Sequence, residues 1–183
     1  FFATGGIGGV HREPPYDISA DLLQLGHTPI IVVCAGAKAI LDIPATLEVL
    51  ETNSVPVVGY QTDDFPAFYS TSSGFPVPLR VDRPQEIARI AKSHWKLGLK
   101  SALLVVVPPP IESALDSEMV QLAINAALIE AKEKNVRGQA ITPFLLSKVN
   151  EKTAGLSMKA NLDLLLNNAR TAALIAVQLS GED

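Results

Sequence analysis

The sequence predicts an α/β fold in which a mostly parallel sheet carries helices on both faces, as one domain over residues 1–183. Uninterrupted apolar runs alternate along the chain with stretches whose apolar residues recur at helical spacing. The runs at 30–34, 55–60 and 101–107 are short and rich in β-branched residues. They lack the alternating polar residues of a half-exposed strand, which is typical of strands buried on both faces of a parallel sheet.

Between these runs the capping and breaking residues mark helices. Gly98 ends the helix that we expect Asp82 to cap, and Gly155 separates the last two helices. Thr142 and Pro143 are expected to open a helix after an edge strand over 139–142. The expected helices cover 20–25, 44–52, 83–97, 117–135, 142–152 and 157–179, and a further short strand is expected at 79–81.

Composition excludes several classes of protein. Hydrophobic residues make up 48% and charged residues 19% of the chain, which is typical of a globular protein. The net charge of −4, without a basic cluster, argues against a nucleic-acid partner. Proline or charge interrupts every apolar run before it reaches bilayer length, so no membrane partner is expected. The single cysteine, Cys34, lies in a buried strand and favours a reducing compartment, with the cytoplasm as the expected location.

Lys38 is the candidate catalytic residue. It follows the strand at 30–34 after three small residues, Ala35, Gly36 and Ala37, and so lies at the carboxyl end of a strand, where open α/β sheets bind ligands. An ammonium among apolar neighbours has a lowered pKa, and a neutral lysine amine forms Schiff bases with carbonyl compounds. Taken alone, a lysine after a strand is more often simply the first solvated residue of the next helix.

A glycine-rich segment precedes this strand. Four of the five residues 5–9 are glycines, which lets backbone N–H groups converge on an anion such as phosphate. The spacing matches neither established phosphate-binding fingerprint, so a glycine turn without a ligand is the alternative. His11, just after it, is either a ligand contact or a satisfied polar residue.

Asp17, Ser19 and Asp21 follow a turn at Pro14–Pro15. Two carboxylates four residues apart suit a divalent cation. The alternative is helix capping by Ser19 or Asp17, with Asp21 favoured by the helix dipole.

Two later stretches hold further candidates. The connection 61–78 is long enough to cover a site or contact another subunit, and its Phe68 and Tyr69 are either substrate contacts or packing residues. In the last helix, the amides of Asn161, Asn167 and Asn168 interrupt a Leu- and Ala-rich stretch. Buried amides need partners, so they either bind a ligand or pair within a helix interface.

Three segments together resemble the pseudouridine-5'-phosphate glycosidases: FATGGIGGVHR at 2–12, DISADL at 17–22 and VCAGAK at 33–38. Shorter segments agree in order, namely LEVLET at 47–52, VGYQT at 58–62, TPFLL at 142–146 and NNA at 167–169. The resemblance extends over essentially the whole chain.

This resemblance implies reversible cleavage of pseudouridine 5'-phosphate to uracil and ribose 5-phosphate, with a divalent metal, usually Mn²⁺, in a homotrimer. It makes Lys38 the Schiff-base lysine and Asp17 the metal carboxylate. It also assigns the substrate-binding residues, which are Ser19, Ala20 and Asp21, together with Thr4, His11 and Asn161 around the phosphorylated ribose. The family carries a proton-donating glutamate and a second lysine in a preceding segment. We therefore expect this chain to be the C-terminal portion of such a protein and to need that segment for a complete site.

The bond to be cleaved explains the need for an amine. Pseudouridine joins C1' of ribose to C5 of uracil, so the carboxylate strategy of ordinary glycosidases, which protonates a leaving oxygen, does not apply. An iminium at C1' provides an electron sink, and Asp21 is placed to assist ring opening as an acid or base. The alternatives are a different sugar-phosphate lyase that uses the same amine, or a phosphosugar-binding module without catalysis.

Overall fold

The computed structural model describes residues 1–12 and 17–181, and the predicted turn at Pro14–Pro15 lies outside them. In this part of the chain a five-stranded sheet has the order β1-β3-β7-β5-β6, and every neighbouring pair is parallel. The strands are β1 (Phe2–Ala3), β3 (Ile31–Cys34), β5 (Val57–Tyr60), β6 (Leu79–Val81) and β7 (Leu103–Val106). The predicted parallel sheet is therefore confirmed.

The two faces of the sheet belong to different cores. On β3, Ile31 and Val33 belong to one cluster of buried residues, whereas Val32 and Cys34 belong to the other. This split follows from the period of two along a strand. It explains why the strands read as continuous apolar runs, because both faces are covered.

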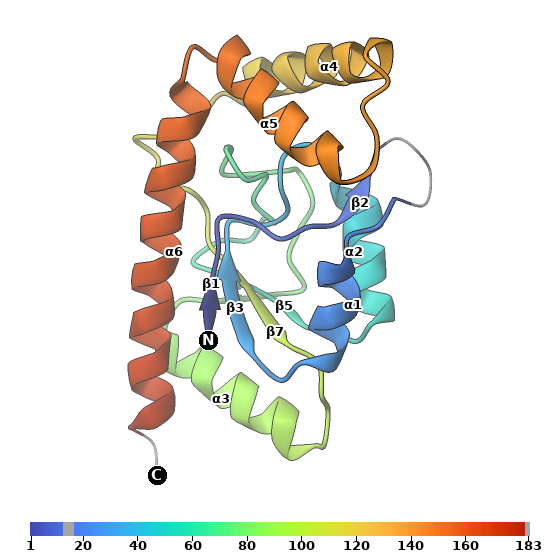
Figure 1. The fold of residues 1–183 in the computed structure, drawn as a ribbon. Coiled ribbons are helices and arrows are strands. Elements are labelled where there is room, and N and C mark those ends of the chain that lie inside the picture. Colours follow the sequence, from blue (N-terminus) through green and yellow to red (C-terminus); the bar gives the residue numbers. More distant parts are fainter. Residues whose placement is uncertain (13–16, 182–183) are drawn as a thin grey trace.

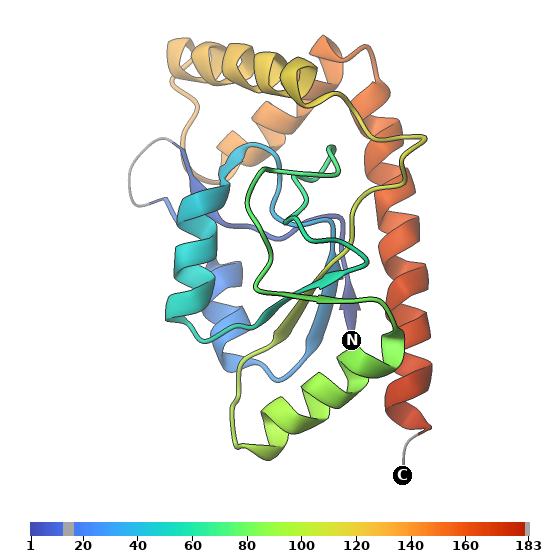
Figure 2. The same cartoon turned by 180° about the vertical axis from the view of Figure 1, so that it is seen from behind.

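Helices cover both faces, as predicted. Helix α1 (Ala20–His27) and helix α2 (Ile43–Thr52) contribute to one core and α3 (Pro84–Lys96) to the other, whereas α6 (Leu156–Ser180) contributes Ala160 and Leu164 to the first and Ala172 and Ile175 to the second. Figure 1 and Figure 2 show α6 running beside β1 and α3, with α1 and α2 across the sheet. Helices α4 (Ser117–Glu133) and α5 (Ile141–Lys152) pack on each other beyond the carboxyl ends of the strands.

The predicted edge strand at 139–142 is wrong. A short 3₁₀ helix, Gly138–Ala140, leads directly into α5, and Ile141 is buried in the core that α4 and α5 share. The backbone of this segment bonds locally, since Ile141 N–H donates to Gly138 O. A small antiparallel pair that the sequence did not predict joins β2 (Val10–His11) to β4 (Leu41–Asp42).

Two predicted helix caps are also wrong. Helix α3 begins after Arg83, and the carboxylate of Glu86 accepts hydrogen bonds from the N–H groups of Asp82 (3.2 Å) and Arg83 (3.0 Å). Glu86 therefore reaches back to the backbone just before the helix, as in a capping box, and Arg83 instead of Asp82 stands at the N-cap. Helix α5 is preceded by Ala140 without a side-chain cap, so Thr142 lies inside its first turn. Among the described residues, no helix combines the length and apolar character that a bilayer crossing requires.

Candidate active site

The candidate site is built on the close pairing of two backbone segments. Residues 4–9, the glycine loop, run beside the segment that follows β3. Four backbone hydrogen bonds join them: Thr4 N–H to Val33 O (3.0 Å), Ala35 N–H to Gly5 O (2.8 Å), Ile7 N–H to Gly36 O (3.0 Å) and Lys38 N–H to Ile7 O (3.1 Å). The last of these fixes the main chain of Lys38 to the glycine loop.

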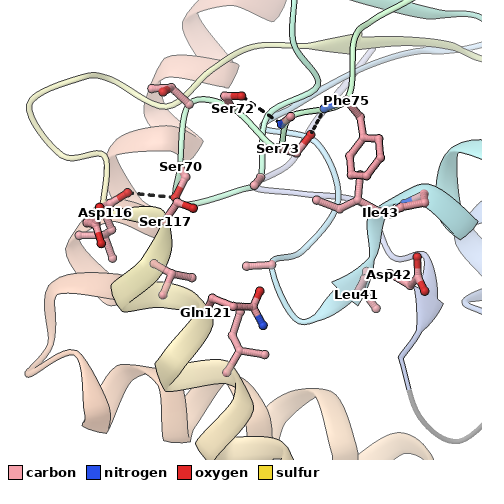
Figure 3. Close-up of a pocket in the computed structure, with 18 of the residues that line it drawn as sticks. Leu41, Asp42, Ile43, Ser70, Ser72, Ser73, Phe75, Asp116, Ser117 and Gln121 are labelled. Carbon is pink, nitrogen blue, oxygen red and sulfur yellow. Dashed lines mark hydrogen bonds between the residues drawn. The ribbon is translucent and has the colours of Figure 1, made fainter.

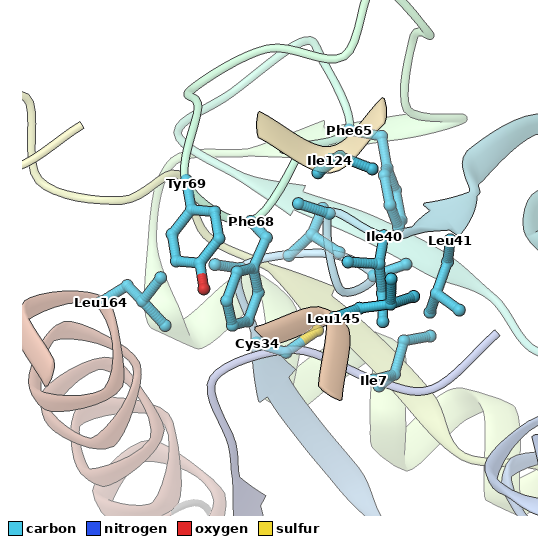
Figure 4. Close-up of a cluster of buried hydrophobic side chains, with 14 of the residues drawn as sticks. Ile7, Cys34, Ile40, Leu41, Phe65, Phe68, Tyr69, Ile124, Leu145 and Leu164 are labelled. Atoms are coloured by element: carbon cyan, nitrogen blue, oxygen red, sulfur yellow. The ribbon is translucent and has the colours of Figure 1, made fainter. Parts of the chain in front are cut away.

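The connection 61–78 provides a third layer. Gly36 has a φ of +80°, and a Cβ at this position would collide with the Pro66 carbonyl oxygen, so glycine is required there. Phe68 has a φ of 63° and donates its N–H to Ala35 O at 3.0 Å. Its ring lies on Gly6, and Figure 4 shows it in the core between Cys34 and Tyr69.

Phe68 and Tyr69 are packing residues. Both are 4% exposed, and their rings meet edge to face with centroids 4.6 Å apart. Of the two interpretations left open by the sequence, packing is the one that the structure supports. A positive φ is unfavourable for a bulky residue, so the surrounding contacts must stabilise it. Here the Phe68 ring packs on Gly6 of the glycine loop.

Lys38 lies on an open cavity of about 320 Å³. Thr4 and Gly6 of the glycine loop and Asp21 and Gln24 of α1 line the same cavity. Its remaining lining is mostly apolar, from Phe2, Ile7, Leu25, Thr28, Ile30 and Val32. Lys38 itself is half-buried. The cavity therefore brings together three of the predicted site residues, Thr4, Asp21 and Lys38.

Ser19 and Asp21 attach α1 to the glycine loop. Ser19 caps the helix, as its Oγ accepts from Asp21 N–H at 3.3 Å, and its own N–H donates to Gly9 O at 3.0 Å. The Asp21 carboxylate accepts from Gly8 N–H at 2.7 Å. The capping role expected of Ser19 is thus confirmed. Ala20 is exposed at the first turn of the helix.

His11 and Asp17 lie apart from the Lys38 cavity. His11 belongs to β2, its N–H donates to Asp17 O at 2.8 Å, and neither residue lines the cavity. Among the described residues, no group of three or more His, Cys, Asp or Glu is placed to hold a metal ion.

Sequence reasoning missed a larger cavity of about 760 Å³ between the start of α2, the connection 61–78 and the start of α4 (Figure 3). Arg12 lies at its edge, donating to Leu41 O (3.2 Å), to Ala39 O (3.1 Å) and to Gln121 Oε1 (3.3 Å). Burial lowers the pKa of the Arg12 guanidinium, an effect that nearby Asp42 opposes. The serine-rich stretch at 70–73, which lines this cavity, was the available signal.

The amides of α6 contact backbone. Asn168 Nδ2 donates to Thr4 O at 2.8 Å and to Gly5 O at 3.4 Å, and Asn167 Nδ2 donates to Pro108 O at 3.3 Å. Asn161 lies close to the glycine loop, with its Oδ1 3.0 Å from where a Cβ on Gly5 would be. It lines a separate cavity of about 330 Å³ and not the Lys38 cavity. The expected pairing of these amides with one another is therefore wrong for Asn167 and Asn168.

Comparison with known proteins supports the resemblance. A pseudouridine-5'-phosphate glycosidase from Caldanaerobacter subterraneus subsp. tengcongensis is 54% identical over 181 residues, which are 98% of this chain and 59% of the relative. One from Gemmatimonas aurantiaca is 56% identical over 178 residues, covering 97% of this chain and 58% of the relative. This chain thus spans about three fifths of the length of these curated relatives.

Solved structures agree. The prealnumycin C-glycosynthase AlnA, in complex with ribulose 5-phosphate, superimposes with a TM-score of 0.91 at 40% identity, covering 98% of this chain and 60% of that one. An indigoidine synthase A-like protein from Thermotoga maritima gives 0.88 at 39% identity, with 96% and 58% covered. The model of the family described as indigoidine synthase A like protein matches residues 1–178. The chain therefore belongs to the indigoidine synthase A-like protein family.

Proposed function

We propose that this chain carries the Schiff-base centre of a pseudouridine-5'-phosphate glycosidase, which reversibly cleaves pseudouridine 5'-phosphate into uracil and ribose 5-phosphate. The observation that carries the proposal is the placement of Lys38, half-buried on a cavity that it shares with Thr4 and Asp21. The names of the curated relatives supply the reaction, and the ribulose 5-phosphate complex of AlnA supports a pentose phosphate as ligand.

In the synthetic direction, the Lys38 amine condenses with the C1' aldehyde of open-chain ribose 5-phosphate and releases water. The resulting iminium carbon accepts the electron pair of uracil C5, which then loses its proton. Attack of the sugar's own hydroxyl at C1' closes the ring and releases the amine. Cleavage is the reverse of these steps, and the iminium is what makes breaking a carbon–carbon bond feasible.

The neighbouring residues have separate roles in this proposal. Asp21, anchored by Gly8 N–H, is placed to move the proton of the ring oxygen as the sugar opens and closes. Ser19 is committed to capping α1, so it and Ala20 contribute through the backbone that shapes the helix start. Thr4, which lines the same cavity, binds the phosphorylated ribose. Contacts from His11 and Asn161 to the sugar phosphate stay predictions, since neither lines the Lys38 cavity.

Mn²⁺ or another divalent cation at Asp17 stays a prediction of the sequence. The described residues do not themselves assemble a cation site, and no step above passes through a metal. A single carboxylate suits a hard cation that takes its other ligands from water and substrate phosphate. Calorimetric titration of Mn²⁺ in the presence of ribose 5-phosphate, with Asp17→Asn for comparison, tests the assignment.

The homotrimer belongs to the same proposal. Apolar side chains on α6 are more than half exposed, among them Leu162 (56%), Leu166 (55%), Leu174 (55%) and Val177 (67%). A surface of this kind is typical of a protein-protein interface. Sedimentation equilibrium of the full-length protein gives the subunit number, and a monomer at micromolar concentration would contradict the trimer.

Trapping tests the role of Lys38. Full-length protein incubated with ribose 5-phosphate and then reduced with borohydride should gain the mass of one reduced pentose phosphate, on the peptide that contains Lys38. Lys38→Arg should lose this adduct, whereas Lys100→Arg, at an exposed lysine, should retain it. An adduct on other lysines, or none at all, would refute the Schiff base.

AlnA supports a second candidate, a C-glycoside-forming enzyme that joins the same sugar to a different carbon nucleophile. Both candidates predict the adduct. They differ in the carbon nucleophile that condenses with ribose 5-phosphate in the synthetic direction without borohydride, which is uracil in the first case and another electron-rich ring in the second. Binding of ribose 5-phosphate without any turnover would instead indicate a binding module.

A further inference from the structure

The buried amide of Asn168 is not explained by packing. Asn168 lies in the middle of α6 and is 0% exposed. Its Nδ2 bonds two successive carbonyls of the glycine loop, those of Thr4 and Gly5. Its Oδ1 is the only buried side-chain polar atom of the described residues without a hydrogen-bond partner.

An unpaired buried acceptor destabilises the folded state, whereas a leucine of similar size at the same position would not. The neighbours of Asn168 on the buried face of α6, such as Leu164 and Ala172, are apolar and would accommodate one. Local rules are broken in this way mostly where a residue serves function. The functional role of Asn168 is therefore expected at the donor end of its amide, which contacts the glycine loop.

The 2.8 Å bond from Asn168 fixes the orientation of one peptide unit, the one between Thr4 and Gly5. The Gly5 carbonyl already accepts Ala35 N–H at 2.8 Å, so the 3.4 Å bond from Asn168 only supports its orientation. A peptide is planar, and its C=O and N–H point in opposite directions. When Asn168 holds the carbonyl of Thr4, the N–H group of Gly5 is turned away from the Asn168 amide. No described residue accepts a hydrogen bond from the N–H group of Gly5 or Gly6. Thr4 and Gly6, on either side of Gly5, line the Lys38 cavity.

We propose that Asn168 is a positioning residue that holds the N–H group of Gly5, next to that of Gly6, in the orientation that receives the anionic end of the substrate. Successive backbone N–H groups in a glycine-rich turn form a concave binding site for anions. Asn168 does not touch the substrate in this arrangement, because it is buried behind the loop. The inference rests on the proposed function for the identity of the anion, a pentose phosphate.

A matched pair of variants on α6 tests the inference in full-length protein. Asn168→Leu removes the donor, and Asn167→Leu changes a neighbouring amide that bonds Pro108 O instead. We expect Asn168→Leu to raise the KM for ribose 5-phosphate by about tenfold or more, the worth of one charge-assisted hydrogen bond, with kcat little changed. Asn167→Leu should stay within about twofold of the unmodified protein, and the melting temperatures of both should stay close to it.

A second measurement holds even where Asn168→Leu does not fold. In the unmodified protein labelled with ¹⁵N-glycine, saturating ribose 5-phosphate should shift the amide resonances of Gly5 and Gly6. The smaller substitution Asn168→Ala should weaken this response. Unchanged Gly5 and Gly6 resonances in protein that still forms the Lys38 adduct would overturn the role of Asn168 and leave the proposed function standing. Equal KM values for the Asn168 and Asn167 variants would do the same. Loss of the adduct from unmodified protein would instead refute the proposed function.

Discussion

Substituting Gly6 by alanine tests whether Phe68 holds the glycine loop. A Cβ on Gly6 would lie 2.5 Å from Phe68 Cδ2, 2.7 Å from Phe68 Cε2 and 3.1 Å from Gly36 O. The ring has no room to retreat, because Phe68 is 4% exposed and its other side meets Tyr69 edge to face. Either the Phe68 ring or the glycine loop must therefore move.

The magnitude follows from two opposing effects. Overpacking a tight core costs about 1–3 kcal/mol. Replacing glycine with alanine also restricts the unfolded chain, which stabilises the folded state by about 0.4–1 kcal/mol. The free energy of unfolding should therefore fall by about 1–2 kcal/mol, which corresponds to a melting temperature lower by about 2–8 °C for a chain of this size.

Urea unfolding of Gly6→Ala, Phe68→Ala and the double variant measures this effect. Phe68→Ala alone should cost about 3–5 kcal/mol, because it leaves a cavity. In that background the clash is gone, so Gly6→Ala should be nearly neutral, and the coupling between the two changes should reach about 1 kcal/mol or more. If Gly6→Ala is neutral in the unmodified protein, or lowers the free energy of unfolding equally in both backgrounds, the tight packing of Phe68 on Gly6 is refuted.

Two further predictions concern buried groups away from the glycine loop. Ser101 is 3% exposed, donates to Ser54 O at 2.5 Å and lies 2.9 Å from His94 Nε2, so Ser101→Ala leaves the buried His94 ring nitrogen without this partner and should lower the free energy of unfolding by about 1–3 kcal/mol. The control Ser180→Ala, at an exposed serine, should stay within about 0.5 kcal/mol in the same urea titration, and an equal loss in both would contradict the assignment. Burial raises the pKa of the Cys34 thiol to about 12, so at pH 8 it should be inert to a thiol reagent until urea unfolds the chain. Because the folded pKa lies above the unfolded one, the stability that Cys34 contributes is complete below the ordinary thiol pKa and is lost as pH rises towards 12. Cys34→Ala should flatten this alkaline decline, and fast labelling of native protein would show the burial to be wrong.

The sheet and most helices could be predicted from the sequence, because their signals are local. An uninterrupted β-branched run such as 101–107 is stable only with both faces covered, and Gly98, with a φ of +86°, ends its helix as expected. The predictions of a helix cap and of an edge strand were wrong where the local sequence is compatible with more than one structure. Helix α3 begins one residue later than expected, after Arg83, and the carboxylate of Glu86 bonds the N–H groups of Asp82 and Arg83. Ile141 fits a strand or a helix by its sequence, and in the structure it belongs to helix α5.

The candidate site was predictable in part, for the same reason. Thr4 and Lys38 each lie just beyond the carboxyl end of a strand, and neighbouring parallel strands bring such positions together. The left-handed conformation of Phe68 and the targets of Asn168 were not predictable. They depend on contacts between residues far apart in the chain, and no spacing rule connects an amide in α6 to a carbonyl in the glycine loop.

The bond from Asn168 to Thr4 spans 164 positions of the sequence, which has a consequence during synthesis. At translation rates of about 5–20 residues per second, the ribosome adds α6 about 8–33 s after the glycine segment has been made. Until then the first strand and its turn lack the helix that orders them, although β3 and β7 already have their partners. Nascent chains released before this helix emerges should therefore bind no sugar phosphate.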